Sequence, residues 1–354
     1  MKVCHLTPTW FSPESLLGGG ERFAEELARA MAERVEVKLV SFGRREIREE
    51  PAPHLQRVVL RSRTRDLMTP FSPALFRELR GADVIHCHQY FTLPTFLAAL
   101  SGRLRGTPVF VSDLGGGGWT PAYQLDQSRW ITAHLPISEY AARALPGRNH
   151  RYRVIWGGVD LDRYPMRPEP SHDGSVIFLG RLLPHKGVHF LIEGLPPGVR
   201  LHVIGPEPDP SYAARLRELA CRRDVVFHGA LADEMVIDRL GQAMALVHPT
   251  PVDAAGSAGV NELFGLALVE AMARGCPVIA SDAASLPEIV EPGRSGLLVP
   301  PNDPAALGRA IERLRDDPPL WRETSTGARR RVEERFTWER VVDRCLDAYG
   351  GWGG

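Results

Sequence analysis

Short hydrophobic runs rich in Val and Ile alternate along the chain with longer stretches in which hydrophobic residues recur at helical spacing. Runs that are hydrophobic throughout are typical of parallel strands, because such strands are buried on both faces. Since crossovers between parallel strands are right-handed, the alternation predicts doubly wound α/β domains. The expected strands cover residues 3–6, 35–40, 58–60, 83–86, 109–112, 133–137 and 153–155, then 176–180, 200–204, 225–228, 244–248, 277–280 and 296–299.

An unpatterned stretch with three prolines, 163–174, separates the two series of strands, and 354 residues suit two domains better than one. We therefore expect a first domain at 1–166, a second at 167–335, and a helix at 336–354 that crosses back onto the first domain. Ligands of open parallel sheets bind beyond the carboxyl ends of the strands, so a site is expected in an inter-domain cleft.

Composition narrows the class of protein. The 43 basic and 43 acidic residues give a formal net charge of zero, so the charge gives no indication of a nucleic-acid partner. Five scattered cysteines without metal-type spacing are typical of a reducing compartment. The first residues do not form a signal-peptide pattern, and no hydrophobic run reaches the roughly 18–20 residues of a membrane span. A cytoplasmic protein is expected, with peripheral attachment to the inner face of a membrane left open.

The segment 261–275, NELFGLALVEAMARG, carries the strongest chemical signal. After Gly265 it is hydrophobic on every side of a helix except at Glu270, and a buried carboxylate needs a polar partner. Gly265 favours a break before the helix, so Glu262 is expected on the loop that leads into it. Free amides at the start of the helix can bind an anion. The alternative is that Glu270 pairs with a structural arginine while Glu262 is exposed.

Two other segments could contribute to an anion site. Arg181 and Lys186 lie in 178–187, FLGRLLPHKG, just after an expected strand, where they suit a diphosphate leaving group, or are solvated surface charges. Gly19 and Gly20 precede an amphipathic helix and would let a ligand approach the backbone, or form a flexible loop. No GxGxxG fingerprint is complete, which disfavours a nicotinamide oxidoreductase.

These motifs together resemble a known family. ELFGL followed by EAMA and GCPVIA, GRL followed by KG, VIWGGVD at 154–160, and PEIV followed by GxxGLLV at 287–299 are similar to motifs of the retaining GT-B glycosyltransferases of family four, the glycosyl transferases group 1. The resemblance implies an α/β GT-B fold of two doubly wound Rossmann-like domains with parallel sheets. The first domain would bind the acceptor and the second the nucleotide-sugar donor.

The same resemblance implies a hexosyltransferase that moves a sugar from a UDP- or GDP-linked donor to a hydroxyl acceptor, with retention and without a metal or other cofactor. Arg181 and Lys186 would hold the diphosphate, and Glu270 the ribose hydroxyls. Glu262 would bind the transferred sugar and stabilise its oxocarbenium-like transition state. The donor-binding set implied is Arg181, Lys186, Glu270, Phe264, Gly265, Leu266, Gly19 and Gly20.

The acceptor side departs from the family pattern. The usual acceptor-side histidine has no clear equivalent, and in its place we expect Asp113 to handle the proton, unless it only forms a turn before the glycines. In the sequence His86-Cys87-His88, His88 is expected to lie beyond the strand and to line the acceptor side, with strand-end packing as the alternative. No metal site is expected, because no third ligand stands at useful spacing.

Arginines between Arg44 and Arg65 outnumber acidic residues. Such a strip could contact anionic lipid head groups, which would suit a lipid-linked acceptor, or it forms a solvated hairpin. A sugar or a small molecule is the other class of acceptor. Two alternatives to glycosyl transfer keep the same architecture, namely a nucleotide-sugar epimerase and a non-catalytic sugar-binding protein.

Overall fold

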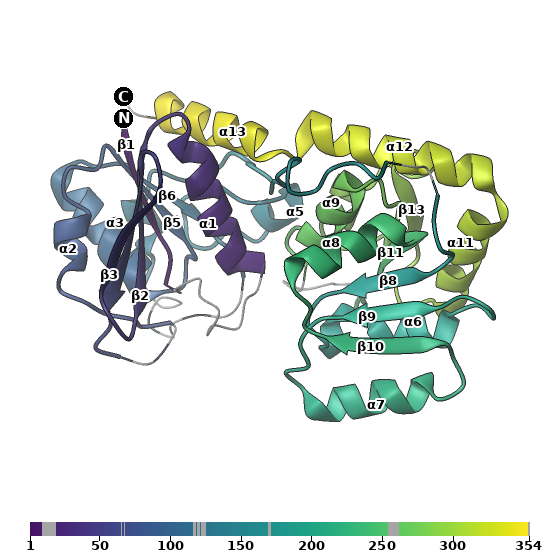
Figure 1. Cartoon of the computed structure of the whole chain (residues 1–354). Helices are drawn as coiled ribbons and strands as arrows, with labels where there is room; N and C mark the ends of the chain where they lie inside the picture. Colours follow the sequence, from purple (N-terminus) through teal and green to yellow (C-terminus); the bar gives the residue numbers. More distant parts are fainter. Residues whose placement is uncertain are drawn as a thin grey trace. The chain divides into compact units, whose positions relative to one another are not determined.

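The computed structural model describes residues 1–8, 19–64, 66, 68–115, 118, 121, 125–168, 171–253 and 262–352. The chain divides into two compact units, Met1–Gly158 with Trp338–Gly354 (unit 1) and Val159–Thr337 (unit 2). Each unit has its own sheet (Figure 1). The stretch 163–174 falls within unit 2, where the buried Arg167 side chain donates to the carbonyls of Leu240 and Ala243. The acceptor and donor roles expected of the two domains stay predictions.

In the described residues unit 1 contains a seven-stranded sheet in the order β3-β4-β2-β1-β5-β6-β7. Neighbouring strands are parallel except β3 and β4, which form an antiparallel hairpin at one edge. The strands are β1 Lys2–Leu6, β2 Glu36–Gly43, β3 Ile47–Ala52, β4 Leu55–Arg61, β5 Val84–His88, β6 Val109–Ser112 and β7 Ala133–His134.

The strand expected at 153–155 does not form. Arg153 N–H donates to the His134 carbonyl and Ile155 N–H to the Pro136 carbonyl, as they would in a parallel ladder. Pro136 has no N–H to return the next hydrogen bond, so only a single bridge remains, between His134 and Tyr152.

Helices cover the sheet of unit 1. Helix α13 packs against α1, so the end of the chain returns to the first unit. A hydrophobic core between sheet and helices includes Leu6, Val58, Leu75 and Val111. The helices are α1 Gly19–Ala32, α2 Leu75–Glu78, α3 Leu93–Arg105, the 3-10 helix η1 Gln127–Trp130, α5 Glu139–Ala142 and α13 Trp338–Gly351.

In its described part unit 2 has a six-stranded parallel sheet in the order β10-β9-β8-β11-β12-β13. In sequence terms this is the 3-2-1-4-5-6 order of a dinucleotide-binding fold, and the order reverses between β8 and β11. The strands are β8 Val176–Leu179, β9 Leu201–Ile204, β10 Val225–Gly229, β11 Ala245–His248, β12 Val278–Ser281 and β13 Gly296–Val299. The helices are η2 Pro184–Lys186, α6 Val188–Gly194, α7 Pro210–Ala220, α8 Asp233–Gln242, α9 Leu266–Ala273, α10 Leu286–Ile289, α11 Pro304–Asp316 and α12 Pro318–Arg335.

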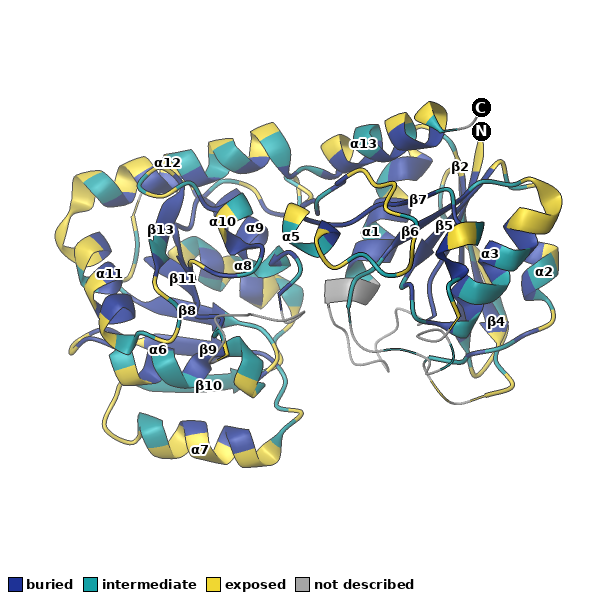
Figure 2. Ribbon diagram, turned by 180° about the vertical axis from the view of Figure 1, so that it is seen from behind, coloured by how far each residue is buried: buried dark blue, intermediate teal, exposed yellow. Residues whose placement is uncertain are grey.

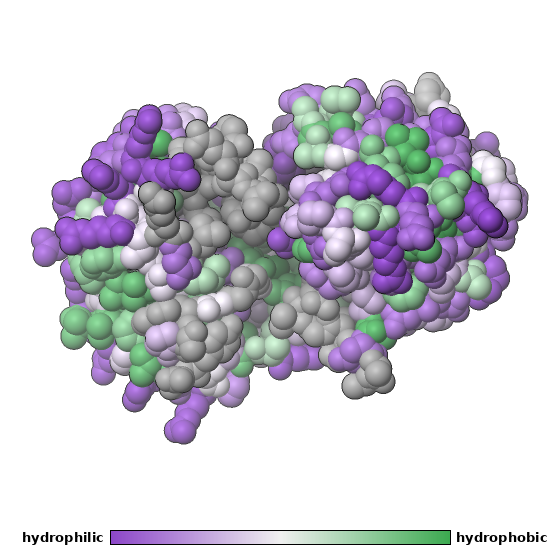
Figure 3. All heavy atoms as spheres, turned by 90° about the horizontal axis from the view of Figure 1, so that it is seen from below, coloured by the Kyte–Doolittle hydropathy of each residue, from purple (hydrophilic) through white to green (hydrophobic). Residues whose placement is uncertain are grey.

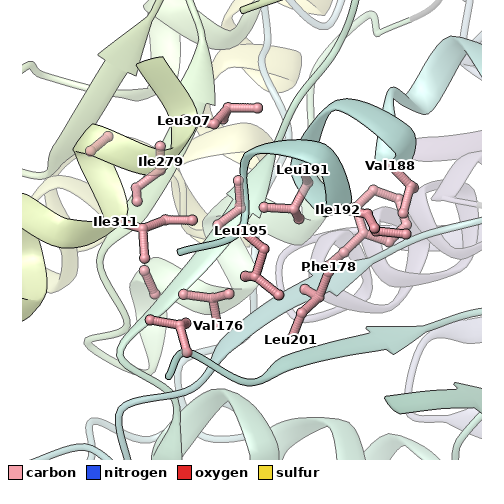
Figure 4. Close-up of a cluster of buried hydrophobic side chains, with 14 of the residues drawn as sticks. Val176, Phe178, Val188, Leu191, Ile192, Leu195, Leu201, Ile279, Leu307 and Ile311 are labelled. Carbon is pink, nitrogen blue, oxygen red and sulfur yellow. The ribbon is translucent and has the colours of Figure 1, made fainter. Parts of the chain in front are cut away.

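The core of unit 2 lies between its sheet and the helices α6 and α11. Figure 4 shows this cluster, in which Val176 and Phe178 of the sheet are drawn together with Leu191 of α6 and Ile311 of α11. Most strands of both sheets are dark blue in Figure 2, whereas the edge strand β10 is teal and the outer sides of α7, α11 and α12 are yellow. The other edge strand, β3, is also largely exposed. Strands buried on both faces confirm the predicted doubly wound domains.

Hydrophilic residues are spread over both units on the face seen in Figure 3, interspersed with hydrophobic ones. Across the described ranges, no helix combines the length and the hydrophobicity that a membrane span requires.

Candidate functional site

Charged and polar residues gather in unit 2 where the strand order reverses. Lys186 comes shortly after β8, and His248 is the last residue of the neighbouring β11. Gly187, at φ +71°, ends the segment after β8, and a Cβ there would overlap the carbonyl oxygen of Pro249. Only glycine therefore allows this close approach, which brings Lys186 to the carboxyl end of β11. This is the edge at which doubly wound sheets bind their ligands.

The carboxylate of Glu262 lies at the centre of this site. Lys186 Nζ is 2.6 Å and His248 Nε2 is 2.9 Å from the same oxygen, Oε2. On the other side of its ring, His248 Nδ1 is 3.0 Å from Thr250 Oγ1. The loop that carries Glu262 is fixed by Ser285, whose hydroxyl lies 3.0 Å from the carbonyl oxygens of Glu262 and Phe264.

Glu262 is 8% exposed, so the alternative of an exposed loop residue is wrong. Burial by itself raises the pKa of the Glu262 carboxyl, but the charges and hydrogen bonds of Lys186 and His248 outweigh it and hold that pKa well below its usual range. The residue is therefore an ionised, partly enclosed carboxylate at neutral pH.

Helix α9 follows as the sequence predicted. It spans Leu266–Ala273, and Glu270 on it is 8% exposed. Gly265 stands before the helix at φ +101°, a conformation that other residues avoid, and it separates the Glu262 loop from the helix. The backbone of Phe264, Gly265 and Leu266 thus enters the helix at the expected place.

Arg181 and His185 belong to the segment after β8. The Arg181 side chain is exposed, and within the part of the chain that the structure describes no hydrogen bond or ion pair holds its guanidinium. Burial lowers the pKa of His185, and the positive charges of Lys186 and Arg181 lower it further. The site therefore combines a fixed cation, Lys186, with a nearby cation that is open to a ligand.

His88 does not lie beyond its strand, contrary to the expectation from the sequence. It is the last residue of β5 and is completely buried, with Nε2 2.8 Å from Nδ1 of His5 on the adjacent β1. His86 joins this cluster, and ring nitrogens of the three residues lie within 4.8 Å of one another. His5 is therefore the third potential metal ligand, which the spacing of residues in the sequence did not reveal. The contacts that the structure shows are hydrogen bonds within the core.

Asp113 follows β6, and its side chain is partly buried. Burial raises the pKa of its carboxyl, while the N–H of Gly115 donates to Oδ1 at 3.3 Å. This bond is that of an Asx turn, so Asp113 does form a turn before the glycines. Its role with the acceptor stays a prediction. Gly19 and Gly20 are the first residues of α1, and their place over a diphosphate also stays a prediction.

Sequence reasoning missed His248, Thr250 and Ser285. His248 and Thr250 were within reach, because a polar residue at the carboxyl end of a hydrophobic strand is unusual and stands where ligands bind. Nothing in the local sequence indicates that Ser285 bonds to residues more than 20 positions away.

The arginine strip is partly neutralised. Arg48 pairs with Glu78 at 2.8 Å and with Glu46 at 3.1 Å, and Arg57 pairs with Glu49 at 2.6 Å. Arg65 lies outside the described residues. These ion pairs fit the hairpin alternative, and lipid contact stays a prediction.

In the comparison with known protein families, two family models match consecutive parts of the chain. The model described as Glycosyltransferase Family 4 matches residues 17–163, and the model described as Glycosyl transferases group 1 matches residues 166–331. A D-inositol 3-phosphate glycosyltransferase of Streptomyces bingchenggensis is 33% identical over 55% of this chain and 47% of that protein, so the match spans about half of its length. An alpha-maltose-1-phosphate synthase of Mycolicibacterium smegmatis is 29% identical over 76% of this chain and 79% of that protein.

Among solved structures, the Anabaena protein HepE in complex with UDP and glucose superposes with a TM-score of 0.76 at 20% identity. The superposition covers 99% of this chain and 100% of HepE. At this level of identity the likeness shows the fold alone.

Proposed function

Because the chain belongs to glycosyltransferase family 4 and has its GT-B fold of two Rossmann-like units, we propose that it is a retaining glycosyltransferase that uses a nucleoside-diphosphate sugar. The sugar goes to a hydroxyl group of an acceptor, and the donor is of the UDP or GDP type. No metal takes part, since Arg181 and Lys186 supply the positive charge for the diphosphate.

One observation carries this proposal, namely the ionised Glu262 with Lys186 and His248 at the switch point of the unit 2 sheet. A buried carboxylate can accept hydrogen bonds from sugar hydroxyls and stabilise positive charge that develops on the sugar ring. Lys186, with Arg181 nearby, can bind a diphosphate and stabilise the negative charge that it gains as the glycosidic bond breaks.

The remaining residues complete a donor site. The backbone amides at the start of α9 can donate hydrogen bonds to an anion, because the N–H groups of a first helical turn have no partners within the helix. Glu270 then binds the ribose hydroxyls. That HepE was solved with UDP and glucose supports a uridine nucleotide as the first donor to test.

The test is a thermal-shift panel of UDP, GDP, ADP and NAD on the wild type and on Arg181→Ala. A ligand that binds only the folded state raises the melting temperature, so we expect a shift with UDP or GDP in the wild type. Arg181 is exposed, so its loss should leave the melting temperature without ligand unchanged and should reduce the ligand-induced shift.

A shift with NAD alone, or with none of the four, contradicts the proposal. So does a full UDP or GDP shift in Arg181→Ala, which would remove the phosphate role of this residue.

A further inference from the structure

The described residues hold the carboxylate of Glu262 at one of its two oxygens. Lys186 and His248 both approach Oε2, at 2.6 Å and 2.9 Å. For Oε1, the described residues provide no hydrogen-bond partner. Within the described part of the chain, one oxygen is therefore fixed and the other is available to accept a hydrogen bond from a ligand.

The two residues that hold Oε2 differ in rigidity. His248 ends a strand in the interior of the sheet, its side chain is 5% exposed, and its second ring nitrogen is 3.0 Å from the Thr250 hydroxyl. Its ring also lies near that of Phe178, with centroids 6.4 Å apart. Lys186 ends a short 3-10 helix and carries its charge on a flexible four-carbon stem. His248 is therefore the more rigid of the two.

Under the proposed function, Lys186 binds the donor diphosphate in addition to Glu262. An ammonium group that turns toward phosphate oxygens gives up part of its interaction with Glu262. We propose that His248 is a positioning residue that keeps Oε2 of Glu262 in place when Lys186 engages the diphosphate, so that Oε1 meets a hydroxyl of the transferred sugar. This inference rests on the proposed function, since it takes Glu262 to be the sugar-binding carboxylate.

Two substitutions separate the two ends of the imidazole ring. Glutamine places an amide N–H close to the position of Nε2, whereas asparagine places one close to Nδ1. His248→Gln thus keeps a donor for Glu262, and His248→Asn keeps only the contact with Thr250. Loss of a hydrogen bond to a charged group lowers kcat roughly 10- to 100-fold, so we expect a fall of that size in His248→Asn and at least about a tenfold smaller one in His248→Gln.

The assay is the rate at which nucleoside diphosphate is released from UDP-glucose, UDP-N-acetylglucosamine or GDP-mannose. Titration calorimetry with UDP and GDP on the same variants should give nearly unchanged dissociation constants, because Arg181 and Lys186 remain. His202→Asn is the matched control, since His202 belongs to the same sheet, bonds to His228 at 2.9 Å and lies outside the site. It should keep the wild-type rate.

The outcomes distinguish the inference from the proposed function. Wild-type kcat in His248→Asn, beside an inactive Glu262→Gln, overturns the role of His248 alone. Equal losses of kcat and of nucleotide affinity in both His248 variants also overturn it, because His248 would then only support the fold. A wild type that releases no nucleotide from any of the three donors, or a fully active Glu262→Gln, overturns the proposed function and this inference with it.

A second measurement needs no turnover. The ¹H–¹⁵N signal of the His248 ring should move when Glu262→Gln replaces the charged acceptor by a neutral one. An unchanged signal contradicts the hydrogen bond on which the inference depends.

Discussion

The histidines His5, His86 and His88 form a hydrogen-bonded cluster in the core of unit 1. Ser112 Oγ donates to a backbone carbonyl, so it accepts a hydrogen bond from His86 Nε2–H, 2.8 Å away. His86 Nδ1 then accepts from the Tyr349 hydroxyl at 2.7 Å. His5 and His88 share the hydrogen bond between their rings. Each ring fills its place as a neutral imidazole.

Burial keeps the three rings neutral. It lowers the pKa of His5 to about 3. It also lowers the pKa values of His86 and His88 well below the usual value, and neighbouring histidines lower these two slightly further. In the unfolded chain the same residues titrate near pH 6.5. Unfolding therefore takes up protons below that pH, and the folded state loses stability as the pH falls.

We accordingly predict acid sensitivity that begins near neutrality. Three such histidines cost about 4 kcal/mol of the free energy of unfolding between pH 7.5 and 5.5. Urea denaturation at pH 7.5, 6.5 and 5.5 measures this loss. Carboxylates such as Glu262 have lowered pKa values and contribute only at lower pH. Equal stability at pH 7.5 and 5.5 would show that the rings are not buried as neutral groups.

At the scale of single elements, the turn between β8 and α6 decides whether the site forms. Gly187 caps η2 and precedes α6, and the Pro249 carbonyl occupies the space that a side chain would need. Gly198, between α6 and β9, has a similar φ of +76°, but no atom lies within 4 Å of the place that a Cβ would occupy there. Substitutions at the two glycines therefore distinguish the stability lost through an unfavourable φ from the stability lost through steric overlap.

Gly187→Ala should destabilise the chain by about 1–3 kcal/mol more than Gly198→Ala, because only the former forces β11 and the Lys186 segment apart. Chemical denaturation of the two variants gives the difference. Gly187→Ala should in addition weaken UDP or GDP binding, since Lys186 moves away from the end of β11. Equal stability losses in the two variants would refute a role for the close approach.

On the scale of the whole molecule, the chain leaves unit 1 at Gly158 and returns to it at Trp338. Trp338 begins α13, stacks edge-on against Phe23 with ring centroids 5.3 Å apart, and donates to Glu26 at 2.8 Å. In unit 2, Trp321 is likewise buried, and its indole N–H donates to the Met244 carbonyl at 2.9 Å. Each tryptophan thus belongs to the core of one unit.

Replacing either tryptophan by alanine should cost about 3–5 kcal/mol, the typical loss for a buried aromatic side chain. Hydrogen exchange should speed up selectively in unit 1 for Trp338→Ala and in unit 2 for Trp321→Ala, because each unit has its own core. Peptide-resolved exchange with mass spectrometry measures both. Faster exchange spread evenly over both units in either variant would mean that the units unfold as one.

The sequence by itself determined which segments are buried and which residues carry charge among them. Hydrophobic runs indicated nearly all strands of both sheets, and the helix that carries Glu270 was predicted with its start at Gly265, because burial and glycine conformation are properties of local sequence. The family motifs also placed Arg181, Lys186 and Glu262 near the ends of elements.

Only the tertiary structure decided which of these residues meet. Lys186 and Glu262 are 76 positions apart in the sequence, and His5 and His88 are 83 positions apart. Each pair comes into contact because of the order of the strands in its sheet. The hydrogen bond that Pro136 cannot donate matters only because residues 153–155 lie beside it, and the local sequence does not show this neighbour. Strand order is set by the packing of the whole core, so no local pattern could show that His248 and Lys186 share one oxygen of Glu262.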